Sequence, residues 1–131
     1  MKRFLLSSVA VLNLLVLDQA VKEWAIRSLG VGGGKAIVAI DGFLDFVCIK
    51  NFGCAWGLLQ GAVWPLAVFA AVAMAFLLWK RECFFSPDWQ GTLCELLLYA
   101  GLLGNLYDRV LRGGVIDMID CHWGAHHFPV F

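Results

Sequence analysis

The stretch AVWPLAVFAAVAMAFLLW, residues 62–79, decides the fold because it is uncharged along its whole length. An α-helix needs roughly 17–25 apolar residues to cross the hydrocarbon core of a bilayer. Pro65 falls in the first turn, where a missing N–H does least harm, and Lys80 and Arg81 follow the last residue. The stretch therefore predicts a membrane-spanning helix over residues 62–79.

Two further stretches predict membrane-spanning helices, over residues 4–23 and 93–111, although both contain charges. The first reaches spanning length only if Asp18 is included. In the second, the charges stand near the ends, where side chains can reach the membrane surface. Residues 1–3 before an apolar run are also typical of a secretory signal. The run meets Asp18 and Lys22 instead of a small-residue cleavage site, which favours an uncleaved first helix.

The composition of the whole chain agrees with a lipid environment. Of its 131 residues, 61% are hydrophobic and 15% are charged, whereas a soluble domain usually has about 25% charged residues. One domain of this length cannot bury so much apolar surface away from water, and a disordered chain is excluded. The net charge is zero, so no basic field for nucleic acid exists. We expect a single membrane-embedded domain over residues 1–131 that contacts membrane lipid and no nucleic acid.

Basic residues set the expected orientation. The positive-inside rule places residues 2–3 and 80–81 on the cytoplasmic side, although four basic residues within 22–50 point the other way. The connection between the first two helices then lies outside. It holds two apolar runs, 36–40 and 43–49, around an Asp-Gly pair, which is a strong hairpin signal. The predicted fold class is membrane all-α, with three transmembrane helices and a small extracytoplasmic β-sheet.

Polar motifs gather at the expected outer ends of these elements. They are DQAVK (18–22), NFGCAWG (51–57), GLLGNLYDR (101–109) and GGVID (113–117). Ionisable residues near the bilayer are costly and usually functional, so their convergence on one face predicts a site. Two structural interpretations stay open. In the first motif, Asp18 and Lys22 could form only an ion pair that ends the first helix. In the second motif, the four-residue spacing of Gly53, Gly57 and Gly61 could serve only helix packing.

The third and fourth motifs carry the groups best suited to chemistry. On a helix, the three-and-four spacing puts one set of residues on a single face: Gly101, Gly104, Asn105, Asp108 and Arg112. Arg109 adds a guanidinium nearby. Asp117 follows a Gly-Gly break among apolar residues, so desolvation should raise its pKa, which suits general acid–base work. The alternative for this carboxylate is a cap on a short interfacial helix.

The C-terminal histidines do not predict a metal site. His122 and His126 have helical spacing, but Gly124 between them weakens a helix, and no carboxylate stands between them as in H-E-x-x-H. The neighbouring residues with ligand chemistry are Asp120, Cys121 and His127. We expect these histidines to be surface or interfacial residues, and the protein to use no metal.

Taken together, the four polar motifs resemble those of the lipoprotein signal peptidases, also called signal peptidase II. The family patterns are D-x-x-[TS]-K, N-x-G-x-A-F, G-x-x-G-N-x-x-D-R and V-x-D-F, and the matches occur in this order over essentially the whole chain. Each motif is weak alone, but four in order with these intervals are highly specific. The departures are Val21 for Thr or Ser, Trp56 for Phe, Leu102 for Ala and Met118 for Phe.

The resemblance implies a four-helix enzyme of the bacterial inner membrane, with the active site at the extracytoplasmic face and no cofactor. Its substrate is a diacylglyceryl-modified prolipoprotein, cut on the N-terminal side of the modified cysteine. Asp117 matches one of two catalytic aspartates, which share a proton while one activates water. The residues implied to bind substrate or order the site are Asn51, Gly53, Gly104, Asn105 and Arg109, with Asp18, Lys22 and Asp108 in support.

The second catalytic aspartate is implied in a last motif, F-N-x-A-D, whose first residue matches Phe131. Asp120 is not expected to replace it, because it lies three residues from Asp117 on the same short element. We therefore expect a truncated product or a fragment, with little or no peptidase activity from residues 1–131. Cleavage at a rate near that of a full-length relative would contradict this expectation. The alternatives are a non-catalytic small membrane protein and a metal-dependent membrane hydrolase.

Overall fold

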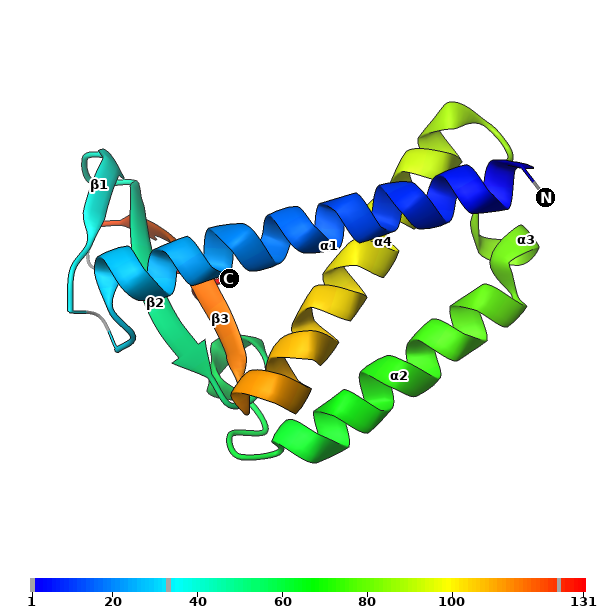
Figure 1. The fold of residues 1–131 in the computed structure, drawn as a ribbon. Helices are drawn as coiled ribbons and strands as arrows, with labels where there is room; N and C mark the ends of the chain where they lie inside the picture. The colour runs from blue at the N-terminus through cyan, green and yellow to red at the C-terminus, as the bar shows by residue number, and fades with distance from the viewer. Residues whose placement is uncertain (1, 33, 125) are drawn as a thin grey trace.

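The computed structural model describes residues 2–32, 34–124 and 126–131, with side chains from residue 7 onward apart from these gaps. The side chains of residues 2 and 3, on which the predicted orientation depends, lie outside the described part. Long helices form one end of the molecule and a small sheet forms the other (Figure 1). The helices are α1 (Lys2–Leu29), α2 (Val63–Trp79), α3 (Arg81–Phe84) and α4 (Trp89–Tyr107).

The three long helices occupy the three stretches that the sequence analysis predicted to be helical. Within the described part of the chain, however, none of them has both the length and the apolar composition that a membrane crossing requires. The predicted membrane-spanning segments are therefore not confirmed.

Helix α1 runs past the ion pair that one interpretation placed at its end. Asp18 and Lys22 form an i,i+4 pair, with Nζ 3.1 Å from Oδ2, and such a pair stabilises a helix rather than ending it. The helix continues to Leu29, because Ala25 and Leu29 are buried against the sheet, where they pack with Cys48 and Ile116. Gly30, with φ +77°, follows directly.

The described residues form an antiparallel sheet in the order β1-β2-β3-β4. The strands are β1 (Ile37–Ile40), β2 (Leu44–Asn51), β3 (Val115–Trp123) and β4 (His126–His127). The predicted hairpin is confirmed as β1 and β2, joined through Gly42 at φ +71°. Strand β3 was not predicted, and the alternative that Asp117 caps a short helix is wrong. Residues 115–123 are extended because they pair along β2.

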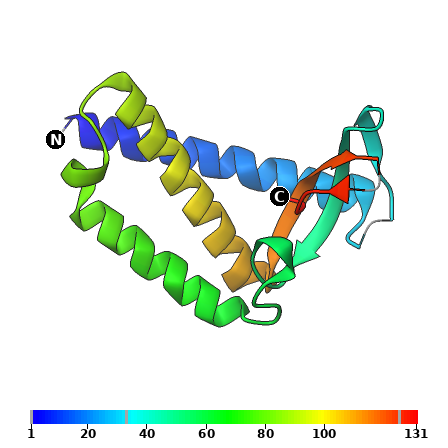
Figure 2. The same ribbon diagram turned by 180° about the vertical axis from the view of Figure 1, so that it is seen from behind.

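One face of the sheet packs into the core and the other lines the pocket. Side chains alternate along a strand, so Ile116 points into the core beneath α1, while Asp117 points away from it. Helix α4 packs against both α1 and α2 and ends in a π-helical turn, Asp108–Arg112, before Gly113 turns the chain into β3. Figure 2 shows the sheet at the end of the helices opposite the N-terminus. This junction of α4, β2 and β3 positions the site.

Candidate active site

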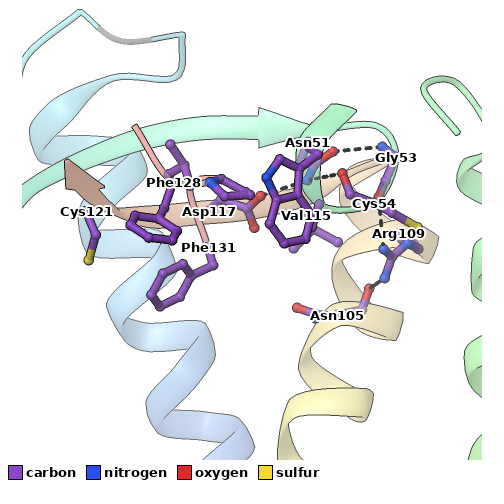
Figure 3. A pocket seen from close by; sticks show the side chains of 14 residues that line it. Asn51, Gly53, Cys54, Asn105, Arg109, Val115, Asp117, Cys121, Phe128 and Phe131 are labelled. Carbon is purple, nitrogen blue, oxygen red and sulfur yellow. Dashed lines mark hydrogen bonds between the residues drawn. The ribbon is translucent and has the colours of Figure 1, made fainter. Parts of the chain in front are cut away.

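A pocket of about 600 Å³ opens on the face of β3 that bears Asp117 (Figure 3). Its polar lining comes from residues that the sequence analysis singled out, namely Asn51, Gly53, Asn105, Arg109 and Asp117. The remaining walls are mostly apolar and include Trp56 and the chain from Phe128 to Phe131. The pocket therefore brings one carboxylate, two amides and one guanidinium together against apolar surface.

Asp117 is the buried carboxylate of this pocket, with 8% of its surface exposed. Asn51 Nδ2 donates a hydrogen bond to Asp117 Oδ2 at 2.9 Å. Burial raises the pKa of Asp117 because loss of water disfavours the charged form, while the Asn51 hydrogen bond and the charges of Lys22 and Arg109 act in the opposite direction. The net effect is a raised pKa, which suits a carboxyl group that exchanges protons during a reaction.

Asn51 is held at both ends of its amide. Its Oδ1 accepts a hydrogen bond from the Gly53 N–H at 2.8 Å, which leaves Nδ2 directed at Asp117. Gly53 has no room for a side chain, because a Cβ there would overlap the Leu58 carbonyl oxygen and stand 3.0 Å from the Gln60 backbone nitrogen. The chain thus folds tightly back on itself after β2, and this turn orients Asn51.

The glycine spacing of this motif does not reflect helix packing. Residues 51–62 form an irregular turn with a short 3₁₀ segment, η1 (Ala55–Gly57). Gly57 and Gly61 adopt φ of +70° and +85°, a left-handed conformation that favours glycine. The interpretation of these glycines as a helix contact is therefore wrong, because the segment reverses direction within a few residues.

Arg109 links the turn to the end of α4. Its Nη2 donates to the Gly53 carbonyl at 3.3 Å and its Nη1 to the Asn105 carbonyl at 3.4 Å. The Asn105 side chain is exposed at the edge of the pocket, below Arg109 in Figure 3. Both side chains can donate hydrogen bonds to a peptide lying in the pocket.

Three of the predicted residues form a charge cluster beside the pocket instead of lining it, with Lys22 and Asp108 buried and Asp18 partly exposed. Asp108 is completely buried, and its Oδ2 lies 2.8 Å from Lys22 Nζ, which also contacts Asp18. Asp108 Oδ2 also accepts the N–H of Ile116, the residue before Asp117, at 3.3 Å. The cluster thus connects α1 to the strand that carries the pocket carboxylate.

Gly104 makes the close approach of α1 and α4 possible. A Cβ at Gly104 would stand 2.5 Å from Asp18 Oδ2, a group already held by Lys22 and Gln19. We expect Gly104→Ala to lower the free energy of unfolding by about 1–3 kcal/mol, as overpacking does. Gly101→Ala is the matched control, because a Cβ there meets nothing within 4 Å. Denaturant unfolding of both variants in detergent checks this, and equal stability of the two would contradict it.

Some residues of the site carry little or no signal in the sequence. Gln19 and Arg112 contact Asp108; the helical spacing indicated Arg112 but assigned it no role, and nothing indicated Gln19. The residues from Phe128 onward were missed because their hydrogen bonds to β3 bring them to the pocket, such as Phe128 N–H to the Cys121 carbonyl at 2.9 Å.

His122 lies on β3, and His126 and His127 form the short edge strand β4. His127 Nδ1 is 3.0 Å from Asp120 Oδ1, and the His127 ring stacks on that of His122. Among the described residues, no three side chains with metal-ligand chemistry converge.

Comparison with solved structures defines the class of protein. Two structures described as bacterial membrane enzymes share this fold. One, solved at 1.9 Å, has a TM-score of 0.73 and 28% identity, covering 95% of this chain and 79% of the other. The second, solved at 2.3 Å, has a TM-score of 0.68 and 29% identity, covering 95% and 75%. The fold is therefore one that bacterial membrane enzymes adopt.

Comparison of sequences identifies the family. A family model described as signal peptidase (SPase) II matches residues 10–131, so the chain belongs to the signal peptidase II family of proteases. A lipoprotein signal peptidase of Shewanella sp. (strain MR-4) is 33% identical over 119 residues, covering 87% of this chain and 68% of the relative. That of Syntrophotalea carbinolica is 32% identical over 120 residues, covering 89% and 73%. The family inferred from the four motifs is confirmed.

Proposed function

We propose that this protein is a lipoprotein signal peptidase, which cuts the signal peptide from prolipoproteins on the N-terminal side of the diacylglyceryl-cysteine. The observation that carries the proposal is Asp117, a buried carboxylate held by Asn51 at the wall of a largely apolar pocket. The relatives described as lipoprotein signal peptidases support the substrate class. The apolar walls suit the hydrophobic part of a signal peptide.

The proposed mechanism uses two carboxylates that share a proton. The ionised carboxylate takes a proton from water, and the protonated one donates a hydrogen bond to the scissile carbonyl, so that water attacks and a tetrahedral intermediate forms. Asp117 is one of the pair. The second is expected from the family motif that starts at Phe131. The Met118 and Ile119 N–H groups donate to the Phe131 carbonyl at 2.9 and 2.7 Å, and this position beside Asp117 supports that expectation.

The other site residues divide into two roles. Asn51, Asn105 and Arg109 would hold the peptide backbone or order the pocket, with Gly53 providing the turn that directs Asn51. Asp18, Lys22 and Asp108 would keep α1 and β3 in place, and Gly104 lets α4 approach them. No metal enters this mechanism.

We also propose that the protein works in the bacterial inner membrane as a single multi-pass domain in contact with lipid, with the pocket at the extracytoplasmic face. Exposed apolar side chains along α2, including Val68, Phe69 and Val72, support a lipid environment. Exposed tryptophans stand near both ends of this helix, Trp64 and Trp79, where the membrane surface favours aromatic rings. The description of the solved relatives as bacterial membrane enzymes supports the same location.

Cleavage of a defined prolipoprotein peptide tests the proposal. The protein that includes the second aspartate expected after Phe131, called full-length below, is incubated in lipid nanodiscs with prolipoprotein peptides. The peptides carry or lack the diacylglyceryl group on the cysteine, and products are identified by mass spectrometry. We expect the modified peptide to be cleaved immediately before its modified cysteine, and the unmodified peptide to be cleaved little or not at all. Cutting elsewhere, or equal cutting of both peptides, would contradict the proposal. Loss of activity on adding a chelator would favour the metal-dependent alternative.

A further inference from the structure

We propose that Gln19 and Arg112 are positioning residues for Asp117, acting through the buried Asp108. This inference rests on the proposed function, because it takes Asp117 as the catalytic carboxylate. Neither residue lines the pocket. Their effect must therefore pass through the contacts that Asp108 makes with α1 and with the start of β3.

Asp108 is joined directly to the strand beside the catalytic carboxylate. Its Oδ2 accepts the Ile116 N–H at 3.3 Å, and its backbone carbonyl accepts the Gly114 N–H at 3.4 Å. Ile116 is itself buried in the core beneath α1. The position of the Asp108 carboxylate thus fixes the first turn of chain into β3, up to Ile116, one residue before Asp117.

The second oxygen of Asp108 is held by Gln19 and Arg112. Oδ1 accepts hydrogen bonds from Gln19 Nε2 at 3.3 Å and from Arg112 Nη1. Gln19 Nε2 also donates to Asp18 Oδ2 at 2.9 Å, while Gln19 Oε1 accepts from Arg112. Because both ends of the amide are used, Gln19 fixes the guanidinium and the carboxylate relative to each other. The Asp108 side chain cannot rotate without breaking several of these contacts.

The π-helical turn at the end of α4 contains both Asp108 and Arg112. Asp108 is its first residue and Arg112 its last, and their side chains pair across the turn. Single π turns inside or at the end of α-helices occur frequently at functional sites. Gly113, at φ +71°, then leads the chain into β3.

Charge balance gives Arg112 a second effect. The connected charges are three carboxylates and three cations, namely Asp18, Glu23 and Asp108 with Lys22, Arg27 and Arg112. Without Arg112, one negative charge stays uncompensated close to Asp117. The charged and polar groups that act on Asp117 are Asn51, Lys22, Arg109 and Asp108, and of these Asp108 raises its pKa. Loss of Arg112 should therefore raise the pKa of Asp117 further.

Four variants of the full-length protein test the inference: Arg112→Met, Arg112→Lys, Gln19→Leu and, as control, Arg27→Met. Arg27 is an exposed arginine of α1 whose partner Glu23 also lies 3.5 Å from Arg112 Nη2, so this variant shows what is transmitted through Glu23 alone. The Asp117 titration is followed by carboxyl ¹³C NMR, Ile116 by hydrogen exchange, and catalysis by kcat and KM on the modified peptide. The first two measurements need no peptidase activity.

We expect Arg112→Met and Gln19→Leu to speed hydrogen exchange at Ile116 and to lower kcat by about 10- to 100-fold, the loss that small misplacements of a reacting group cause. KM should change little, since neither residue lines the pocket. Arg112→Met should also raise the pKa of Asp117. Arg112→Lys should recover part of both effects because it restores the charge, and Arg27→Met should match the wild type.

Three outcomes would overturn the inference. The first is an Arg112→Met protein whose Asp117 titration and Ile116 hydrogen exchange both match the wild type. The second is an Arg112→Lys protein whose kcat and Asp117 pKa are no closer to the wild type than those of Arg112→Met. The third is that Arg112→Met and Gln19→Leu lose their folded structure as a whole, without a selective fall in kcat. Gln19→Leu guards against misfolding, because it removes no charge. An active Asp117→Asn protein would instead overturn the proposed function. An inactive Asp117→Asn protein beside a normal Arg112→Met protein would overturn only the present inference.

Discussion

Replacing Asp117 with asparagine is expected to reduce prolipoprotein cleavage to background, by roughly 10⁴-fold or more, as the removal of a catalytic group does in other proteases. Asparagine has nearly the same shape and can still pair with Asn51, which contacts Asp117 Oδ2 at 2.9 Å. It cannot take a proton from water or share one with a second carboxylate. Rates of cleavage of the modified peptide by the full-length protein measure this loss.

The same variant is expected to fold at least as stably as the wild type. Because burial raises the pKa of Asp117, the ionised form is disfavoured in the folded protein. Its contribution to stability is present below the unfolded pKa and is lost as pH rises through the folded pKa. At neutral pH the uncharged Asp117→Asn variant should therefore unfold at the same temperature or higher. Lost activity with retained stability distinguishes a catalytic carboxylate from a structural one.

Asp120→Asn is the matched control for this experiment. Asp120 lies on the same strand, three residues from Asp117, and its carboxylate contacts His127 on the edge strand β4. Residues an odd number apart on a strand point to opposite faces, so Asp120 does not reach the pocket. We expect nearly full activity from this variant. Equal losses in both variants, or an active Asp117→Asn protein, would contradict the role given to Asp117.

Replacing Lys22 with methionine is expected to lower the free energy of unfolding by about 3–5 kcal/mol, the range for breaking a buried ion pair. The Lys22 side chain is 5% exposed, and its Nζ lies 3.1 Å from Asp18 and 2.8 Å from Asp108. Its removal leaves two carboxylates close together without this cation. Unfolding by denaturant in detergent measures the change.

Arg27→Met tests whether burial is the reason why Lys22→Met loses stability. Arg27 and Glu23 form an i,i+4 pair on the same helix, but the Arg27 side chain is 76% exposed, and exposed pairs contribute little. We expect no measurable change in unfolding. If Lys22→Met behaved like Arg27→Met, the buried cluster would not hold α1 to β3, and the inference about Asp108 would lose its support.

Local patterns in the sequence predicted the helices and the first hairpin well. Uncharged runs and an Asp-Gly turn are signals that lie within a few residues of each other, and α2 and the β1–β2 hairpin follow from them. Strand β3 carried no such signal, because its pairing partner β2 lies far away in the chain. The turn after β2 was misjudged because a four-residue spacing of glycines is shared by helix contacts and tight turns.

The candidate site was predicted as a set of residues but not as an arrangement. The motifs indicated Asn51, Arg109 and Asp117, and the pocket contains all three. The motifs did not distinguish these pocket residues from Asp108 and Lys22, which lie outside the pocket in a buried cluster. Asp108 and Arg109 are neighbours in sequence, and only the packing of α1 against α4 and the sheet decides which of them faces the pocket.

The sequence by itself determined the chemistry available to this protein: a carboxylate among apolar residues at Asp117, an amide at Asn51, and a glycine at position 104 where two helices meet. Residue type and short-range spacing carry that information. Only the tertiary structure decided that Asn51 meets Asp117 across 66 residues of chain, and that Gln19 and Arg112 hold the carboxylate behind it. These contacts depend on how α1, α4 and the sheet bury one another, and no local pattern encodes burial between distant segments.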